Sequence, residues 1–380
     1  MEVLTLEQKA FEQAKEAFGH VINIPEVSLE ELRTSKLFFG SETVQNLIEF
    51  GRQNNELIYP IVEFLGDALS AKNGYRASLC GYLIGVYAES GYATETTDRK
   101  LMQCFSASVK ECYGLLQKHC LVNEIDIQDY LNDPETYPLN VDGLLPEHKH
   151  AVYIWYAMPL LTLGVMSRIS EQRTLRDLLR QDTGLRGACE VLNVFLNNVG
   201  FVPTVLNMVE NETVLFLSPQ KGLGYEVSLQ EVDSNFLMFT LFQYALYHAG
   251  ELEALGVTDY SYDPLVEKVA LHIPLDEGES FPEHLSDKSC FGYHPCTAWQ
   301  MDGSLAAEDM VWGEGTLYEI PKVDGHFVIL LGGPQVTRLW SNAFIASTHS
   351  HLRPRLVIEH KLTPDEVQRW ILRIQNSTLK

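Results

Sequence analysis

The hydrophobic periodicity of this chain changes near residue 200, and that change constrains the fold more than any other feature. Up to that point apolar residues recur at helical spacing, in segments that end at glycines such as Gly19, Gly51 and Gly91. Glycine is the usual residue just past a helix, because it adopts a left-handed conformation at little cost. Residues 1–200 therefore predict an all-helical domain built from antiparallel helix pairs.

The longest uncharged apolar run covers residues 151–166 and contains Pro159. It is shorter than the roughly 20 residues that cross a bilayer, so we expect a buried core helix and no membrane contact. The N-terminus lacks the basic and apolar regions of a secretory signal, and the seven cysteines are irregularly spaced. These features predict a cytoplasmic protein with reduced thiols.

After residue 200 the pattern becomes that of mixed strands and helices. Two β-rich runs at 213–218 and 225–229, around a Pro/Gly turn, predict a hairpin. Five later apolar segments also predict strands, at 267–275, 296–301, 315–321, 325–332 and 355–362. Helices are expected over 235–249, ended by Gly250, and after Thr363, where Pro364 and Glu366 complete a start signal. Residues 201–380 thus predict an α+β domain with a mixed, mainly antiparallel sheet and a C-terminal helix.

The negative charge of the chain is concentrated in one stretch. The net charge is −23, and residues 251–320 contain 15 Asp and Glu side chains against two Lys or Arg. Such a balance excludes a phosphate backbone as a natural ligand, because nucleic acid needs a basic footprint. We expect the acidic segment 251–320 to contact a basic protein partner, with a merely solvated surface as the alternative.

Seven residues of the acidic segment are the candidate partner-binding positions. Six are carboxylates in segments that predict loops, and the seventh is an aromatic residue beside two glycines; they are Asp276, Glu277, Glu279, Glu308, Asp309, Glu314 and Trp312. An indole ring surrounded by acids can hold a cationic side chain. The alternative for Trp312, which the expected strand nearby favours, is a core tryptophan.

The stretch SCFGYHPCTAWQ, residues 289–300, brings together the residue types that bind zinc. Cys290, His294 and Cys296 are candidate ligands, but structural zinc sites normally use two C-x2–4-C pairs, and here there is one cluster. A fourth ligand would have to come from a distant residue such as His284, His326, His349 or His351. We therefore expect no cofactor and a packing role for the stretch, with a zinc site as the alternative.

The sequence contains no catalytic or nucleotide-binding motif. It has no G-x-S-x-G, P-loop or dinucleotide fingerprint. The expected function is a non-enzymatic binding protein, in its most specific form an inhibitor of immunity or antitoxin type that neutralises a basic toxin. Two alternatives stay open: a metal-dependent hydrolase built around His294 and Cys296, and a scaffold that forms a homo-oligomer through its helical half.

Overall fold

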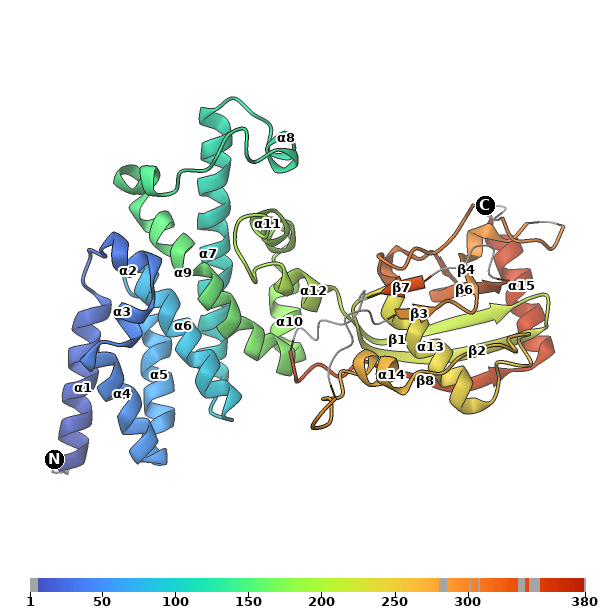
Figure 1. Ribbon diagram of the computed structural model, residues 1–380, viewed down its shortest axis with the longest axis horizontal. Helices are drawn as coiled ribbons and strands as arrows, with labels where there is room; N and C mark the ends of the chain where they lie inside the picture. The colour runs from blue at the N-terminus through green and yellow to red at the C-terminus, as the bar shows by residue number, and fades with distance from the viewer. Residues whose placement is uncertain are drawn as a thin grey trace. The chain divides into compact units, whose positions relative to one another are not determined.

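The chain divides into two compact units, residues 1–206 and 207–380, which we call the helical unit and the sheet unit. The computed structural model describes residues 6–279, 286–300, 302–306, 308–333, 339–341 and 349–378. The helical first part, the mainly antiparallel mixed sheet and the C-terminal helix confirm the predicted α+β class (Figure 1). Helical structure does not end at Gly200, because a short helix begins at the next residue.

The helical unit consists of short and long helices in sequence. They are α1 (Leu6–Ile22), α2 (Leu29–Arg33), α3 (Lys36–Phe39), α4 (Glu42–Gln53), α5 (Ile58–Ala68), α6 (Gly74–Glu89), α7 (Glu95–Val122), α8 (Ile127–Asn132), α9 (Leu145–Glu171), α10 (Arg173–Arg180), α11 (Leu185–Leu192) and α12 (Phe201–Asn207). Gly91 follows α6 with a φ of 85°, as a helix-ending glycine should. The expected stops at Gly19 and Gly51 are wrong, since α1 and α4 continue through them.

Helices α6 and α9 pack closely because glycines lie where they cross. A Cβ on Gly164 would lie 2.2 Å from the carbonyl oxygen of Gly81, and a Cβ on Gly85 would lie 2.5 Å from the Cα of Gly164. Neither position has room for a side chain, so glycine is what lets the two backbones touch. Within the described residues, Asp142–Glu171 is the one helical stretch long and apolar enough to span a membrane. Its most apolar window is 78% buried inside the protein, which is the position of a core helix.

A buried ion pair joins α9 to α7. The guanidinium of Arg168 donates two hydrogen bonds to the carboxylate of Asp98, Nε to Oδ1 at 2.8 Å and Nη2 to Oδ2 at 2.9 Å. Both residues are 1% exposed. Such a pair contributes little over an apolar contact, but removing Asp98 leaves the buried guanidinium with only the half-exposed carboxylate of Glu171, which pairs with its Nη1.

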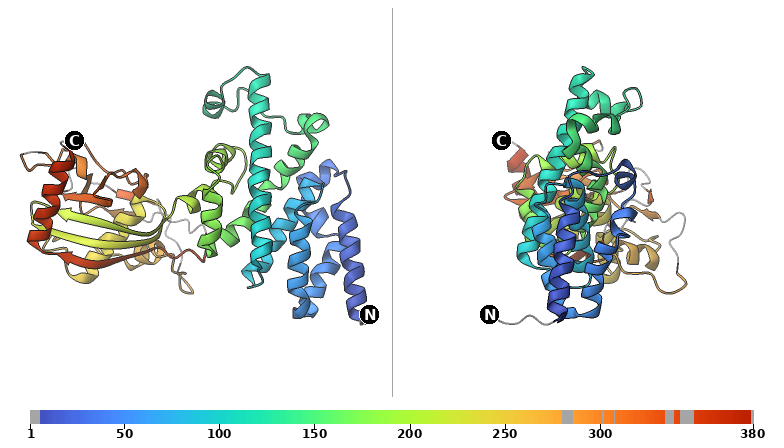
Figure 2. Two further views of the ribbon diagram at one scale, coloured as in Figure 1. Left: turned by 180° about the vertical axis from the view of Figure 1, so that it is seen from behind. Right: turned by 90° about the vertical axis from the view of Figure 1, so that its left-hand side faces the viewer.

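Six strands of the sheet unit form one mixed sheet within the described residues. In spatial order they are β4 (Gly292–Pro295), β6 (His326–Gly332), β1 (Val209–Ser218), β2 (Leu223–Val232) and β8 (Arg355–Leu362), with β5 (Lys322–Val323) also paired to β6. Neighbours are antiparallel except β1 and β6, which run parallel. Strands β1, β2 and β8 run side by side in Figure 1 and in the left view of Figure 2. A separate ribbon pairs β3 (Ser286–Lys288) with β7 (Leu339–Ser341).

Each face of this sheet is covered by one long helix. Alternate residues of β1 point to opposite faces, so that Val214 and Phe216 join the core under α13 (Asn235–Ala249). Leu215 and Leu217 join the core under α15 (Pro364–Thr378). Both helices were predicted, and Gly250 ends α13 in the left-handed conformation, as expected.

Three expected strands are wrong. Residues 264–270 form the helix α14 (Pro264–Ala270), because Asp263 caps it, its Oδ1 accepting from the backbone N–H of Leu265 at 2.9 Å. The segments 296–300 and 315–321 contain 3₁₀ turns, Cys296–Ala298 and Leu317–Glu319. Met301, the last residue expected in the first of these strands, lies outside the described residues. The predicted hairpin and the strands at 325–332 and 355–362 are confirmed as β1–β2, β6 and β8.

Replacing Asp98 by alanine should destabilise the helical unit strongly. Arg168 would keep its charge in a buried position and lose its bidentate partner, with only Glu171 still paired to it, which costs about 3 kcal/mol of the free energy of unfolding. Urea unfolding followed by circular dichroism measures this loss. Asp67→Ala is the matched control, because Asp67 pairs with Lys100 at 2.6 Å on the surface, where a pair is worth about 1 kcal/mol or less. Equal losses in the two variants would contradict the prediction.

Candidate functional site

The segment from Glu308 to Glu319, which we call the acidic loop, contains four of the candidate partner-binding residues. Glu308, Asp309 and Glu314 are exposed, and their carboxylates have no hydrogen-bond or ion-pair partner among the described residues. Trp312 is 65% exposed. The interpretation of Trp312 as a core residue is therefore wrong, and the structure presents its indole at the surface beside acids.

The first turn of α13 fixes the backbone of this loop. The backbone N–H of Asn235 donates to the carbonyl of Gly315 at 2.9 Å, and that of Phe236 donates to Gly313 at 2.9 Å. The Asn235 side chain adds a hydrogen bond from Nδ2 to the carbonyl of Trp312 at 2.8 Å. The first amides of a helix have no acceptor within the helix, so the loop and the helix satisfy each other.

Close packing holds the same loop from the side of the core. A Cβ on Gly313 would lie 2.1 Å from the ring of Phe236, so only glycine fits there. Val311, next to Trp312, is 6% exposed and packs in the core under α13. Its backbone N–H donates to the carbonyl of Tyr293 in β4 at 2.8 Å. Trp312 is thus displayed by a segment whose neighbouring residues are buried and hydrogen-bonded.

His294 binds the backbone near the beginning of the acidic loop. Its side chain is fully buried, and Nδ1 lies 2.6 Å from the carbonyl oxygen of Asp309. Because that carbonyl only accepts, Nδ1 donates the hydrogen of this bond, while Nε2 is buried with no hydrogen-bond partner among the described residues. The ring fills the space above two glycines: a Cβ would lie 2.8 Å from Nε2 at Gly292 and 3.1 Å at Gly332. This histidine holds a loop in place.

The three candidate zinc ligands do not come together. Cys290 packs against the core under α13, whereas Cys296 belongs to the core under α15, on the opposite face of the sheet. No three His, Cys, Asp or Glu side chains among the described residues form a group that could hold a metal ion. Of the candidate fourth ligands, His326 contacts the ring of Trp370, while His349 and His351 contact each other. His284 lies outside the described residues.

The remaining candidate carboxylates lie in the segment that follows α14. Lys268 binds Asp276 at 2.6 Å and Glu279 at 2.9 Å, and it lowers the pKa of Glu279 by hydrogen bonding to its charged form. Glu277 is exposed. The structure therefore divides the predicted set: the three candidate carboxylates of the acidic loop have no cation beside them in the described part of the chain, whereas Asp276 and Glu279 share Lys268.

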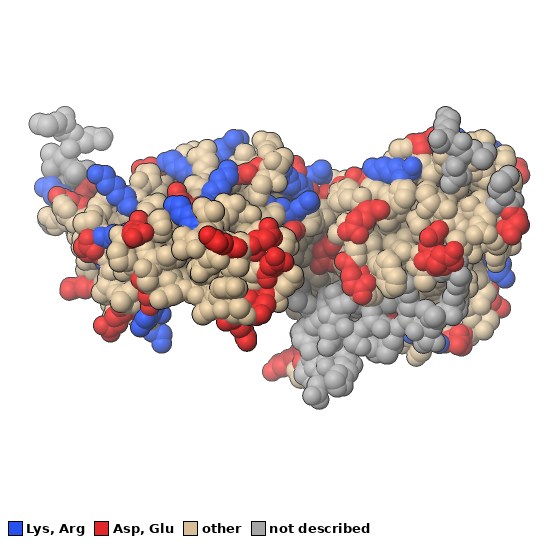
Figure 3. All heavy atoms as spheres, turned by 90° about the horizontal axis from the view of Figure 1, so that it is seen from above, with Lys and Arg blue, Asp and Glu red and all other residues tan. Residues whose placement is uncertain are grey.

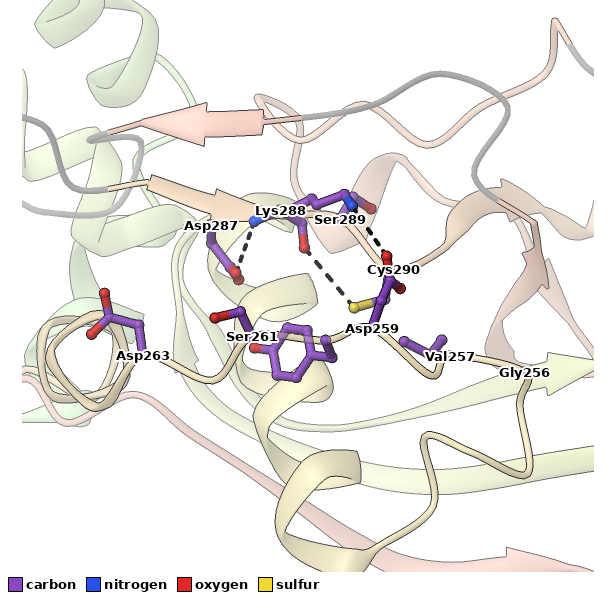
Figure 4. Close-up of a pocket in the computed structure, with 10 residues that line it drawn as sticks. Gly256, Val257, Asp259, Ser261, Asp263, Asp287, Lys288, Ser289 and Cys290 are labelled. Carbon is purple, nitrogen blue, oxygen red and sulfur yellow. Dashed lines mark hydrogen bonds and ion pairs between the residues drawn. The ribbon is translucent and has the colours of Figure 1, made fainter.

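A pocket of about 490 Å³ lies elsewhere in the acidic segment and was not predicted (Figure 4). Three carboxylates, two serines, a tyrosine, a lysine and a thiol line it together with two small residues: Asp259, Asp263, Asp287, Ser261, Ser289, Tyr260, Lys288, Cys290, Gly256 and Val257. Lys288 Nζ lies 3.8 Å from the carboxylate of Asp259. Sequence spacing gives no signal for this site, because β3 brings Asp287 back to a loop more than twenty residues earlier.

Asp287 and Cys290 are the chemically distinctive groups of this pocket. Asp287 is 6% exposed and accepts hydrogen bonds from the backbone N–H of Lys288 at 2.9 Å and from Gln243 Nε2 at 3.1 Å. Burial raises the pKa of Asp287 to about 6. Burial also raises the pKa of the Cys290 thiol to about 12, so the reactive thiolate is scarce at neutral pH. The pocket suits binding better than nucleophilic chemistry.

The acidic side chains of the sheet unit do not merge into one patch on the face drawn in Figure 3. Asp and Glu stand there as separate groups among uncharged side chains, in the right-hand part of the view. Net charge alone therefore does not define a docking face on this side. Local geometry, in the acidic loop and in the pocket, decides where a cation is held. Comparison of the chain with protein-family models, curated proteins and solved structures finds no match.

Asp287 should make the stability of the sheet unit depend on pH. Its folded-state pKa of about 6 lies above the ordinary value near 3.9, so the native state binds the proton more tightly. The stabilisation from this proton is complete below about pH 4 and is lost as the pH rises through 6. Relative to Asp287→Asn, the wild type should lose about 2–3 kcal/mol between pH 4 and 7.

The measurement is the difference in the free energy of unfolding between the two proteins across that pH range. Asparagine places an amide opposite Gln243, which can lower the free energy of unfolding by an amount that is the same at every pH. Such a constant difference does not change the slope of the free energy of unfolding against pH. Parallel pH profiles for the two proteins would contradict the raised pKa.

Proposed function

We propose that this chain is a non-enzymatic, cytoplasmic binding protein that holds a basic protein partner through its acidic loop. The observation that carries the proposal is that Glu308, Asp309 and Glu314 keep unpaired carboxylates beside the exposed indole of Trp312. Each of these exposed carboxylates gains electrostatic free energy when a cation of another protein comes into contact with it. The pairs that would neutralise it from within the described part of the chain are absent.

Rigidity of the loop also supports a binding role. Ordering a mobile loop at the moment of association costs free energy, and a loop already held by a helix start and a buried histidine avoids much of that cost. Concentrated charge of one sign then raises the rate of encounter with a basic partner. An inhibitor of immunity or antitoxin type must capture its toxin quickly. Among binding proteins, we therefore propose that this chain is an inhibitor of that type, with a basic toxin as its partner.

The pocket offers a second contact for the same partner. Gln243, which binds Asp287 at the pocket, follows Asn235, which binds the loop, by eight residues along α13. At 1.5 Å per residue the two positions are about 12 Å apart along the helix axis. A basic segment several residues long can span that distance.

Reversing the charge of the acidic loop should weaken the binding of a basic peptide. The variant is Glu308→Lys, Asp309→Lys and Glu314→Lys together, and the probe is a fluorescent peptide of mixed arginine and lysine. Three attractive contacts become repulsive, so the Kd should rise by about tenfold or more at low salt. Fluorescence anisotropy in a salt series measures it, and wild-type binding should weaken as the Debye length falls below about 10 Å.

The matched control carries the same charge change away from the loop. Glu30, Glu63 and Glu111 of the helical unit are exposed, and Glu30→Lys, Glu63→Lys and Glu111→Lys together should leave the Kd within about threefold of the wild type. Equal weakening in both variants would mean that net charge, and not this loop, governs binding. Binding by the wild type that is indifferent to salt would contradict the proposal.

A further inference from the structure

We propose that the acidic loop selects arginine over lysine in its partner, with the guanidinium lying flat on the indole of Trp312 and bound by Glu314. This inference rests on the proposed function, because it presupposes a basic partner at this loop. It adds the chemistry of the side chain that is recognised. The ligand that we propose for the acidic loop is an arginine-bearing segment of another protein.

A tight turn places the two recognition groups close together. The backbone N–H of Gly315 donates to the carbonyl of Trp312 at 3.3 Å, which closes a turn with Gly313 and Glu314 at its centre. Trp312 and Glu314 are only two residues apart, so their Cα atoms lie within about 7 Å of each other. Trp312 and Glu314 are both exposed, while Gly313 between them is buried. A group lying on the indole is therefore within reach of the Glu314 carboxylate.

The chemistry of this pair favours a guanidinium over an ammonium ion. A guanidinium is planar and weakly hydrated, so it stacks on an aromatic face and still presents a fork of N–H donors to a carboxylate. An ammonium ion is a compact and strongly hydrated charge, which gains less from the ring. Glu308 and Asp309 attract both cations alike, so the preference comes from Trp312 and Glu314.

The loop is built to hold the indole in a fixed place. The carbonyl of Trp312 is bound by Asn235 Nδ2 at 2.8 Å, and the residues on both sides of Trp312 are buried. The carboxylate of Glu319, at the other end of the loop, takes part in a capping box with Thr316. Glu314 is consequently the carboxylate that is both close to the ring and available to a partner.

The acidic loop contains a second exposed aromatic residue, Tyr318. Tyr318 is 53% exposed and contacts the ring of Phe327 edge-on, with the centroids 6.0 Å apart. This contact holds the phenol ring in position.

The experiment compares two fluorescent peptides of equal length and charge, one with arginine and one with lysine as its only basic residue. The wild type should bind the arginine peptide about threefold to tenfold more tightly, by anisotropy at low salt. Trp312→Ala should bring that ratio to about one, and Glu314→Gln should reduce it, while both variants still bind in a salt-dependent way. Tyr59→Ala, at an exposed aromatic residue of the helical unit, should leave the ratio unchanged.

Each outcome separates this inference from the proposed function. Equal affinity of the wild type for both peptides, with salt dependence intact, overturns arginine selection and leaves the basic partner standing. Failure of the wild type to bind either peptide overturns the proposed function. An arginine preference that persists in a folded Trp312→Ala variant overturns the assignment to this ring.

A neutral citrulline peptide that binds as tightly as the arginine peptide would show that the contact is apolar, and it would overturn both the arginine selection and the proposed function. Trp312→Phe, which keeps an aromatic face, should retain part of the preference.

Discussion

The sheet unit depends on strands that are apolar on both faces. In β1, Phe216 faces α13 and Leu217 faces α15, and water must be excluded from both sides. Helix α13 is therefore fixed over one face, and its first backbone amides need acceptors that lie outside the helix. The carbonyls of the acidic loop supply them. Burial of the sheet thus determines where Trp312 is displayed.

The stretch that contains the candidate zinc ligands, residues 289–300, supports this arrangement through its packing and hydrogen bonding. Cys290 and Cys296 are divided between the two cores, and His294 binds the backbone carbonyl of Asp309 through Nδ1. A buried imidazole is an effective brace, because it is rigid and can bond to a carbonyl that would otherwise be left without a donor. The acidic loop is consequently held at two places, by His294 near its start and by α13 in its middle.

Local signals made much of the fold predictable, and distant contacts explain what the sequence did not reveal. Capping residues such as Thr363, and Gly250 at the end of α13, act within a few residues of their own position. The helix α14 also has such a signal, Asp263 before Pro264, which the apolar residues that follow it obscured. By contrast, the neutralisation of Asp276 by Lys268 and the return of Asp287 to the pocket depend on how separate segments meet. Composition located the acidic segment, and only tertiary structure separates the available carboxylates from the paired ones.

The proposed binding requires that the acidic loop is already folded before any partner arrives. Amide hydrogen exchange of the isolated protein tests this most directly, because the N–H of Val311 and that of Phe236 are the donors that hold the loop. We predict that both exchange as slowly as the amides of β6, which lie in the centre of the unit. Fast exchange at Val311 and Phe236, with β6 still protected, would show that the loop is unformed without a partner and would contradict the account.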